Sequence, residues 1–190
     1  MTDETKLTPE ESLAVITSMI LQSKGHVQKS SFYFLLWGWT FAIANLGVFV
    51  LLTYSTLENP FLVFGLTIPS AFISVIHGIR QGKQIVAPTL LDNINKWLWS
   101  GFGITCLIFA FFGERIGWQI NPVIITMCAV PTFLTGIMLR FKPLMWGGVV
   151  FWVAGIASFL AHVSIQFLLA AAAVTFGYLV PGYMLKKSEA

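Results

Sequence analysis

Charged residues are scarce in this 190-residue chain, because only 10% of its residues are Asp, Glu, Lys or Arg. In ordinary soluble domains about a quarter of the residues are charged. Hydrophobic residues instead make up 56% of the chain, and its mean hydropathy is +0.80. The composition excludes an ordinary soluble domain and indicates a membrane protein.

Patterns for catalysis and metal binding are also missing. The sequence has no nucleophile elbow, no His-Glu-x-x-His motif, no glycine-rich phosphate loop and no paired carboxylates in an apolar stretch. A three-histidine site is excluded by depth, since His26 and His77 are expected on one side of the membrane and His162 on the other. A two-histidine metal or haem site at His26 and His77 stays an alternative to ordinary polar contacts. We therefore expect no enzyme, no metal and no cofactor.

Cysteine is rare too, with two residues, Cys106 and Cys128. Both fall inside long apolar stretches, where a thiol behaves as a small apolar group. We therefore predict no disulfide.

Long apolar stretches are what this chain has in abundance. A helix needs about 20 residues to cross a hydrocarbon core of roughly 30 Å. Six stretches meet this length without a charged residue away from their ends: 31–54, 60–79, 95–113, 121–139, 143–162 and 164–185. The sequence predicts an all-α, polytopic membrane bundle of six transmembrane helices, arranged as three consecutive hairpins within residues 31–190.

The basic residues predict the orientation. Ten of the eleven Lys and Arg residues fall on one side of these spans, and Arg115 alone falls on the other. Short loops rich in Lys and Arg stay in the cytoplasm. We expect a multi-pass protein of the cell inner (plasma) membrane with both termini cytoplasmic. The net charge of +3 then follows from topology and membrane lipids, and we expect no nucleic-acid partner.

Residues 1–30 are predicted to form a cytoplasmic amphipathic helix. Thr8, Pro9 and Glu11 have the spacing of a capping box. The apolar stripe that follows consists of Leu13, Ile16, Ile20 and Val27, with Met19 beside it. The helix either lies on the lipid surface or docks on a soluble cytoplasmic protein. Early Glu10 and Glu11 are unusual for a lipid-binding helix, so both interpretations stay open.

One group of residues recurs at a constant offset of 62 positions. Trp37, Asn59, Pro60 and Pro69 return as Trp99, Asn121, Pro122 and Pro131. The third hairpin matches in part, with Trp146 at its start and Pro181 near its end. We interpret this as an internal repeat of a membrane hairpin. The Asn-Pro pairs are expected to cap the helices that start at the outer face.

Pro69 and Pro131 are predicted to interrupt helices about half-way across the membrane, which frees the carbonyl groups of Gly65 and Met127. Neighbouring hydroxyl groups can satisfy these carbonyls. The functional alternative is a central cavity in which interrupted helices border a solute. The residues that would line it are Asn45, Thr67, Pro69, Ser70, Pro131, Thr132 and Thr135.

Several segments resemble an uncharacterised family of small bacterial membrane proteins. They are Glu11-Ser12-Leu13, Phe34–Trp39 (FLLWGW), Phe141–Gly148 (FKPLMWGG) and Tyr178–Tyr183 (YLVPGY). In helix count and repeat style the chain also resembles the HdeD-type acid-resistance membrane proteins. These resemblances imply no activity and no site residues.

The sequence thus favours a regulatory, stress-related or scaffolding membrane component that works through protein and lipid contacts. Its glycine-rich faces would allow close packing within one chain or in a homo-oligomer. The competing class is a small solute or ion facilitator or channel that uses the helices broken by Pro69 and Pro131.

Overall fold

The computed structural model describes residues 8, 13, 30–83, 89–116 and 119–188, and every element in that part of the chain is helical. The elements are α2 (Ser31–Tyr54), η1 (Pro60–Leu66), α3 (Thr67–Gly82), α4 (Leu90–Phe111), η2 (Gly113–Ile116), α5 (Ile120–Met138), α6 (Lys142–Leu160), α7 (Val163–Val174), the π-helical turn η3 (Thr175–Leu179) and α8 (Val180–Ser188). Six helices are long and apolar enough to cross a membrane, with η1–α3 and α7–η3–α8 each counted as one. The all-α class and the six apolar helices are confirmed.

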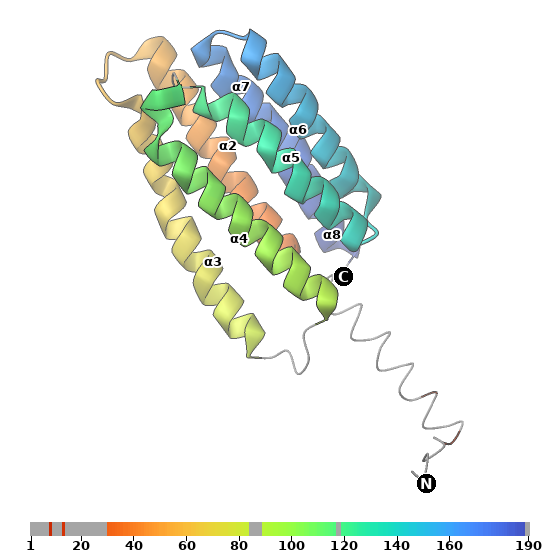
Figure 1. Ribbon diagram of the computed structural model, residues 1–190. Coiled ribbons are helices and arrows are strands. Elements are labelled where there is room, and N and C mark those ends of the chain that lie inside the picture. The colour runs from red at the N-terminus through yellow and green to blue at the C-terminus, as the bar shows by residue number, and fades with distance from the viewer. Residues whose placement is uncertain (1–7, 9–12, 14–29, 84–88, 117–118, 189–190) are drawn as a thin grey trace.

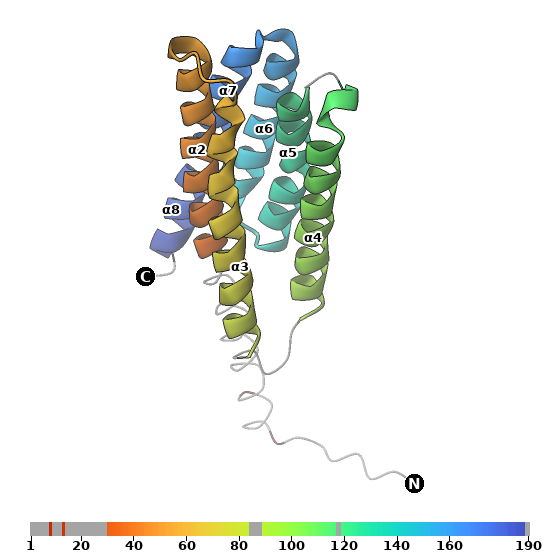
Figure 2. The same cartoon turned by 90° about the vertical axis from the view of Figure 1, so that its left-hand side faces the viewer.

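The helices divide into a packed group and a more exposed pair. α5 packs along α6, and α2 packs along α7 (Figure 1). α3 lies on the far side of α2, and α4 joins the bundle through α5 (Figures 1 and 2). The packed group therefore consists of α2 and α5 to α8.

Small residues let the helices of the packed group approach closely. The buried residues include Ala44, Ala129 and Ala170. A Cβ atom added at Gly148 would lie 2.7 Å from the Cβ of Phe133, and one added at Gly136 would lie 2.6 Å from the amide nitrogen of Met145. Backbones that lack such side chains gain van der Waals contact, which is a main source of helix association in lipid.

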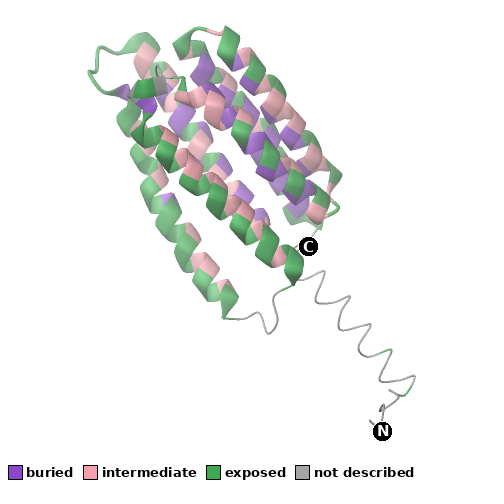
Figure 3. Ribbon diagram, in the orientation of Figure 1, coloured by how far each residue is buried: buried purple, intermediate pink, exposed green. Residues whose placement is uncertain are grey.

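α3 and α4 bury almost nothing against the rest of the chain (Figure 3). None of the 22 residues of α4, all of which the structure describes, is buried. In α3, which is likewise fully described, Ser70 is the single buried residue. We call the exposed faces of Thr67–Gly82 and Leu90–Phe111 the α3–α4 surface.

The observed helix ends differ from the predicted spans at several places. The span predicted at residues 95–113 begins at Leu90, because Thr89 and Asp92 form a capping box. The Asp92 N–H donates to the Thr89 hydroxyl at 3.2 Å, and the Thr89 N–H donates to the Asp92 carboxylate at 2.9 Å. The last predicted span, 164–185, continues to Ser188. Hydropathy predicts only the length of the apolar stretch, whereas capping side chains and the polar residues beside that stretch determine where the helix ends.

The Asn-Pro pairs do not cap helices in the expected way. Asn59 precedes η1 but makes no side-chain capping bond, although Pro60 does occupy the first position of that helix. α5 already begins at Ile120, so Asn121 lies within its first turn. The prediction of two asparagine caps was therefore wrong.

Pro69 and Pro131 also differ from each other. Pro69 lies in the first turn of α3, immediately after the 3₁₀-helix η1, where a backbone N–H has no partner within the helix. Pro131 lies inside the continuous helix α5. Only the second proline therefore interrupts hydrogen bonding in the interior of an α-helix.

Candidate functional site

The seven residues predicted to line a central cavity do not share one environment. Asn45, Ser70, Thr132 and Thr135 are buried, as is Pro131, whereas Thr67 is half-buried and Pro69 is exposed. Their hydrogen bonds divide them among several helix contacts.

Ser70 joins α3 to α2. Its hydroxyl lies 2.7 Å from that of Thr40 and 3.2 Å from the Leu66 carbonyl oxygen. Thr40 in turn donates to the Leu36 carbonyl oxygen at 2.8 Å. Each hydroxyl has one proton to donate. Since each hydroxyl also faces a carbonyl oxygen of its own helix, either one can be the donor in this pair, which forms a direct side-chain link between the two helices.

Thr135 joins α5 to α4. Its hydroxyl donates to Asn95 Oδ1 at 2.9 Å and accepts from Trp99 Nε1 at 3.1 Å. Thr135 is 1% exposed, so it lies inside the packed group. Through these two hydrogen bonds, polar side chains of α4 contact that group. The sequence patterns did not single out Asn95, and they indicated Trp99 only as the repeat partner of Trp37.

Thr132, one turn before Thr135 on α5, belongs to a second polar cluster. Its hydroxyl donates to the Cys128 carbonyl oxygen at 2.7 Å and lies 3.3 Å from the Tyr178 hydroxyl. The Cys128 thiol also hydrogen-bonds the Tyr178 hydroxyl. Aromatic rings surround Tyr178, with centroids 4.8 Å away for Phe151, 5.6 Å for Phe34 and 6.3 Å for Trp99.

Tyr178 lies in the π-helical turn η3, and Pro181 explains why the turn forms there. Pro181 has no N–H to donate to the Gly177 carbonyl four residues earlier, and its ring crowds that carbonyl. The helix widens instead, and the Val180 N–H donates to the Thr175 carbonyl. The freed Gly177 carbonyl faces Gly147, where a Cβ atom would lie 2.5 Å from it. Pro181 was thus the available sequence signal for this turn.

Asn45 is the predicted site residue with unused hydrogen-bonding capacity. Its Nδ2 donates to the Phe41 carbonyl oxygen of its own helix at 2.8 Å. Its Oδ1 is buried and has no partner among the described residues. Thr67 donates to the Phe64 carbonyl oxygen at 2.6 Å, which satisfies its hydroxyl locally.

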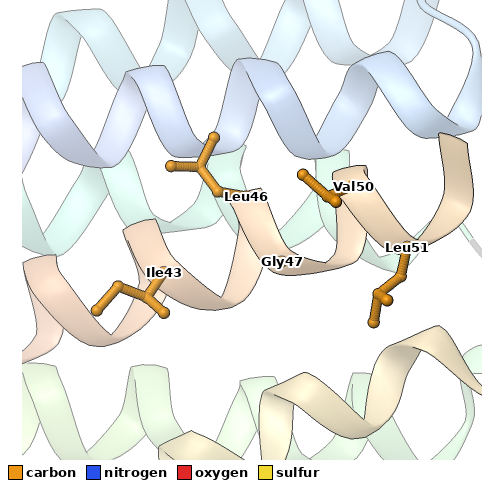
Figure 4. A pocket seen from close by; sticks show the side chains of 5 residues that line it. All are labelled: Ile43, Leu46, Gly47, Val50 and Leu51. Carbon is orange, nitrogen blue, oxygen red and sulfur yellow. The ribbon is translucent and has the colours of Figure 1, made fainter. Parts of the chain in front are cut away.

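Two pockets in the described part of the chain lie away from these residues. The larger, about 500 Å³, is an open groove along α2, lined by Ile43, Leu46, Gly47, Val50 and Leu51 (Figure 4). Its walls carry no polar side chain, so they suit a lipid chain better than a polar solute. The smaller, about 170 Å³, lies between α2 and α3 and contains His77 and Arg80.

The remaining predicted contacts fall mostly outside the described residues. Among the described residues, no group of three or more His, Cys, Asp or Glu side chains could hold a metal ion. His26 lies outside that part of the chain, and so do Ile16, Met19 and Ile20 of the predicted amphipathic helix. Leu13 is described and is 69% exposed.

The helices define a class of protein: six apolar spans of membrane length, which indicate a multi-pass membrane protein. Comparison with protein-family models, curated proteins and solved structures found no match to the chain.

Proposed function

We propose that this protein is a multi-pass component of the inner membrane, without enzymatic activity, that works through contacts in a regulatory, stress-related or scaffolding role. Its termini face the cytoplasm. It contacts lipids and a second copy of the chain through its spans, and a cytoplasmic partner through residues 1–30. The observation that carries this proposal is α4, a span of 22 residues without a buried residue.

The buried polar groups support contact rather than chemistry. Ser70, Thr132 and Thr135 are each engaged with a neighbouring helix, and none of them is charged. Such hydrogen bonds fix helix positions in lipid. A packed group with fixed helices can present the α3–α4 surface in a constant shape.

A second copy of this chain is the occupant that we propose for the α4 part of the α3–α4 surface, from Trp97 to Phe111. Beyond Lys96, α4 has no charged residue through Phe111, so this stretch of α4 offers no charge pattern that would select a different protein. Most oligomers are symmetric, and a two-fold dimer needs a surface that complements itself. A neutral apolar surface meets that requirement.

Gly101 and Gly103 allow a sharp test. Nothing in the described part of the chain lies within 4 Å of a Cβ atom at either position, so a larger side chain leaves the fold of one protomer undisturbed. The two positions point about 200° apart on the helix. A protein neighbour would contact one of them, whereas lipid would surround both.

The experiment measures the mass of the full-length protein in polymer-extracted native nanodiscs, for the wild type and for Gly101→Leu and Gly103→Leu. We expect a dimer in the wild type, loss of the dimer in one variant and its retention in the other. A wild type that is monomeric, or a dimer that survives both substitutions, would overturn the proposed surface.

A small-solute facilitator is the second candidate, because Asn45 carries a buried oxygen without a partner in the middle of a span. Purified protein in liposomes tests it with the Pro69→Ala and Pro131→Ala variants. Solute or ion flux that disappears in these variants would favour the facilitator over the scaffold. We expect wild-type liposomes to leak no faster than protein-free ones.

The cytoplasmic partner is tested separately. Deletion of residues 1–30 should abolish crosslinking of a cytoplasmic protein to the full chain in cells, while the deleted protein still reaches the membrane. An unchanged set of crosslinked proteins would leave the first 30 residues as a lipid-binding helix.

A further inference from the structure

The smaller pocket lies where the last two turns of α3 meet the first turn of α2. It has a volume of about 170 Å³ and is lined by Phe32, Ile73, Ile76, His77 and Arg80. The four α3 residues have the spacing i, i+3, i+4 and i+7, so they form one continuous helix face. Along this face the chemistry changes from two isoleucines to an imidazole and then to a guanidinium.

Aromatic side chains of α2 hold His77 in place. The imidazole stacks on the ring of Phe32, with centroids 4.0 Å apart and planes at 19°. Its Nδ1 lies 3.4 Å from the Tyr33 hydroxyl. Gly78 makes room for this phenol, because a Cβ atom there would lie 3.2 Å from the hydroxyl oxygen. The ring is thus fixed through Nδ1, and Nε2 is the nitrogen that His77 can offer to a ligand.

Positive charge dominates this end of α3. Arg80 is exposed in the last turn, and Lys83 follows at the C-cap. The acidic residues in the described part of the chain lie outside this pocket. Asp92 caps α4, whereas Glu58 and Glu114 lie in the connections that follow α2 and α4 at the other end. The pocket therefore has a net positive charge with no carboxylate of its own helix.

The location selects the ligand. Ile73 and Ile76 are 46% and 49% exposed in the interior of the apolar helix Pro60–Gly82, and in a membrane-spanning helix such positions meet acyl chains. Arg80 lies one turn further along, near the end of the span, at the depth of headgroups. A soluble anion would match only the polar part of this face, which consists of His77 and Arg80. A soluble peptide would have to displace lipid from the isoleucines.

We propose that this pocket binds the headgroup of an anionic phospholipid, with the phosphate at Arg80 and His77 and an acyl chain along Ile76 and Ile73. Guanidinium groups form strong paired hydrogen bonds with phosphate oxygens. The site needs only a headgroup layer at this end of α3. The existence of this lipid site therefore does not depend on whether the protein acts as a scaffold or as a facilitator.

Native mass spectrometry of the full-length, detergent-solubilised protein tests the site. Dioleoyl phosphatidylglycerol and dioleoyl phosphatidylcholine are titrated separately, so that only the headgroup differs. We expect phosphatidylglycerol to bind about fivefold more tightly, as one basic residue near anionic lipid implies. Arg80→Gln should remove this preference. Arg140→Gln, which removes an exposed arginine outside the pocket, should preserve it.

A second variant tests the pocket by shape rather than charge. Ile76→Trp fills the groove at an exposed position and should weaken the binding of both lipids, while the thermal unfolding temperature stays close to that of the wild type. Equal binding of the two lipids by the wild type, or equal losses in Arg80→Gln and Arg140→Gln, would overturn the site. Displacement of phosphatidylglycerol by millimolar inorganic phosphate would overturn the lipid as its ligand.

Discussion

The effect of a glycine on the stability of this protein depends on what lies next to it. Gly148 faces the backbone of Phe133, with the nearest backbone atoms 3.0 Å from a Cβ position. Gly101 faces no atom of the described residues within 4 Å of its Cβ position. Glycine in an exposed helix is less stable than alanine, whereas glycine at a close helix contact permits packing that alanine blocks.

This contrast predicts opposite effects of the same substitution. Gly148→Ala should lower the free energy of unfolding by about 1–3 kcal/mol, because the helices must separate to admit the methyl group. Gly101→Ala should raise it by up to about 1 kcal/mol, because alanine is the better helix former. Denaturation in mixed micelles, followed by tryptophan fluorescence, measures both. Equal effects would contradict the contact between α5 and α6 at Gly148.

At the scale of whole helices, Thr135 is the main polar connection between α4 and the packed group. Valine has nearly the same shape but has no hydroxyl, so Thr135→Val leaves Asn95 and Trp99 without their partner. Side-chain hydrogen bonds between helices in membranes contribute about 0.6 kcal/mol on average. The loss should appear as more frequent separation of α4 rather than as global unfolding.

Cys106 and Cys128 report on this separation. Cys106 lies in α4 and is partly exposed, and Cys128 is buried in α5. We expect Thr135→Val to increase the rate at which a fluorescent maleimide labels Cys106 in detergent by about threefold, with little change at Cys128. Mass spectrometry assigns the labelled residue. Thr105→Val is the control, since the Thr105 hydroxyl donates to the Gly101 carbonyl oxygen of its own helix and, among the described residues, reaches no other helix. If Thr105→Val increased the labelling rate of Cys106 equally, Thr135 would not be the residue that holds α4 to the packed group.

The helices themselves could be predicted from the sequence because length and apolar composition alone make a span. The predicted span at residues 31–54 has the bounds of α2. The start of α4 could not be predicted from hydropathy, because the polar pair Thr89 and Asp92 decides it. The π-helical turn depends on Pro181, which the sequence shows, and on a close approach to Gly147, which only the fold provides.

The candidate site was predictable to a similar degree. Ser70 and Thr132, equivalent in the predicted repeat, each approach the carbonyl oxygen four residues earlier. That local contact follows from helix geometry. Their other partners differ, Thr40 for Ser70 and Tyr178 for Thr132, because the two hairpins pack against different helices. The internal repeat itself stays a prediction.

At the scale of the whole molecule, the charges and the helix ends describe one arrangement. The basic residues in the last turn of the second, fourth and sixth spans or directly after them lie at the end of the bundle where α2 begins (Figures 1 and 2). They are Arg80, Lys83, Arg140, Lys142, Lys186 and Lys187. An even number of spans returns the chain to the side on which the first one started. The fold is therefore compatible with two cytoplasmic termini.

Reporter fusions test this orientation in cells. A green fluorescent protein fused after Ala190 should fluoresce, and alkaline phosphatase at the same position should be inactive, because positively charged ends stay in the cytoplasm. The same reporters inserted between Gly113 and Ile116, in the connection that contains Arg115, should give the reverse result. If both positions gave the same result, one of the three spans between them, α5, α6 and α7–η3–α8, would fail to cross the membrane. If both results were inverted, the six spans would stand but the charge rule would not set the orientation of this protein.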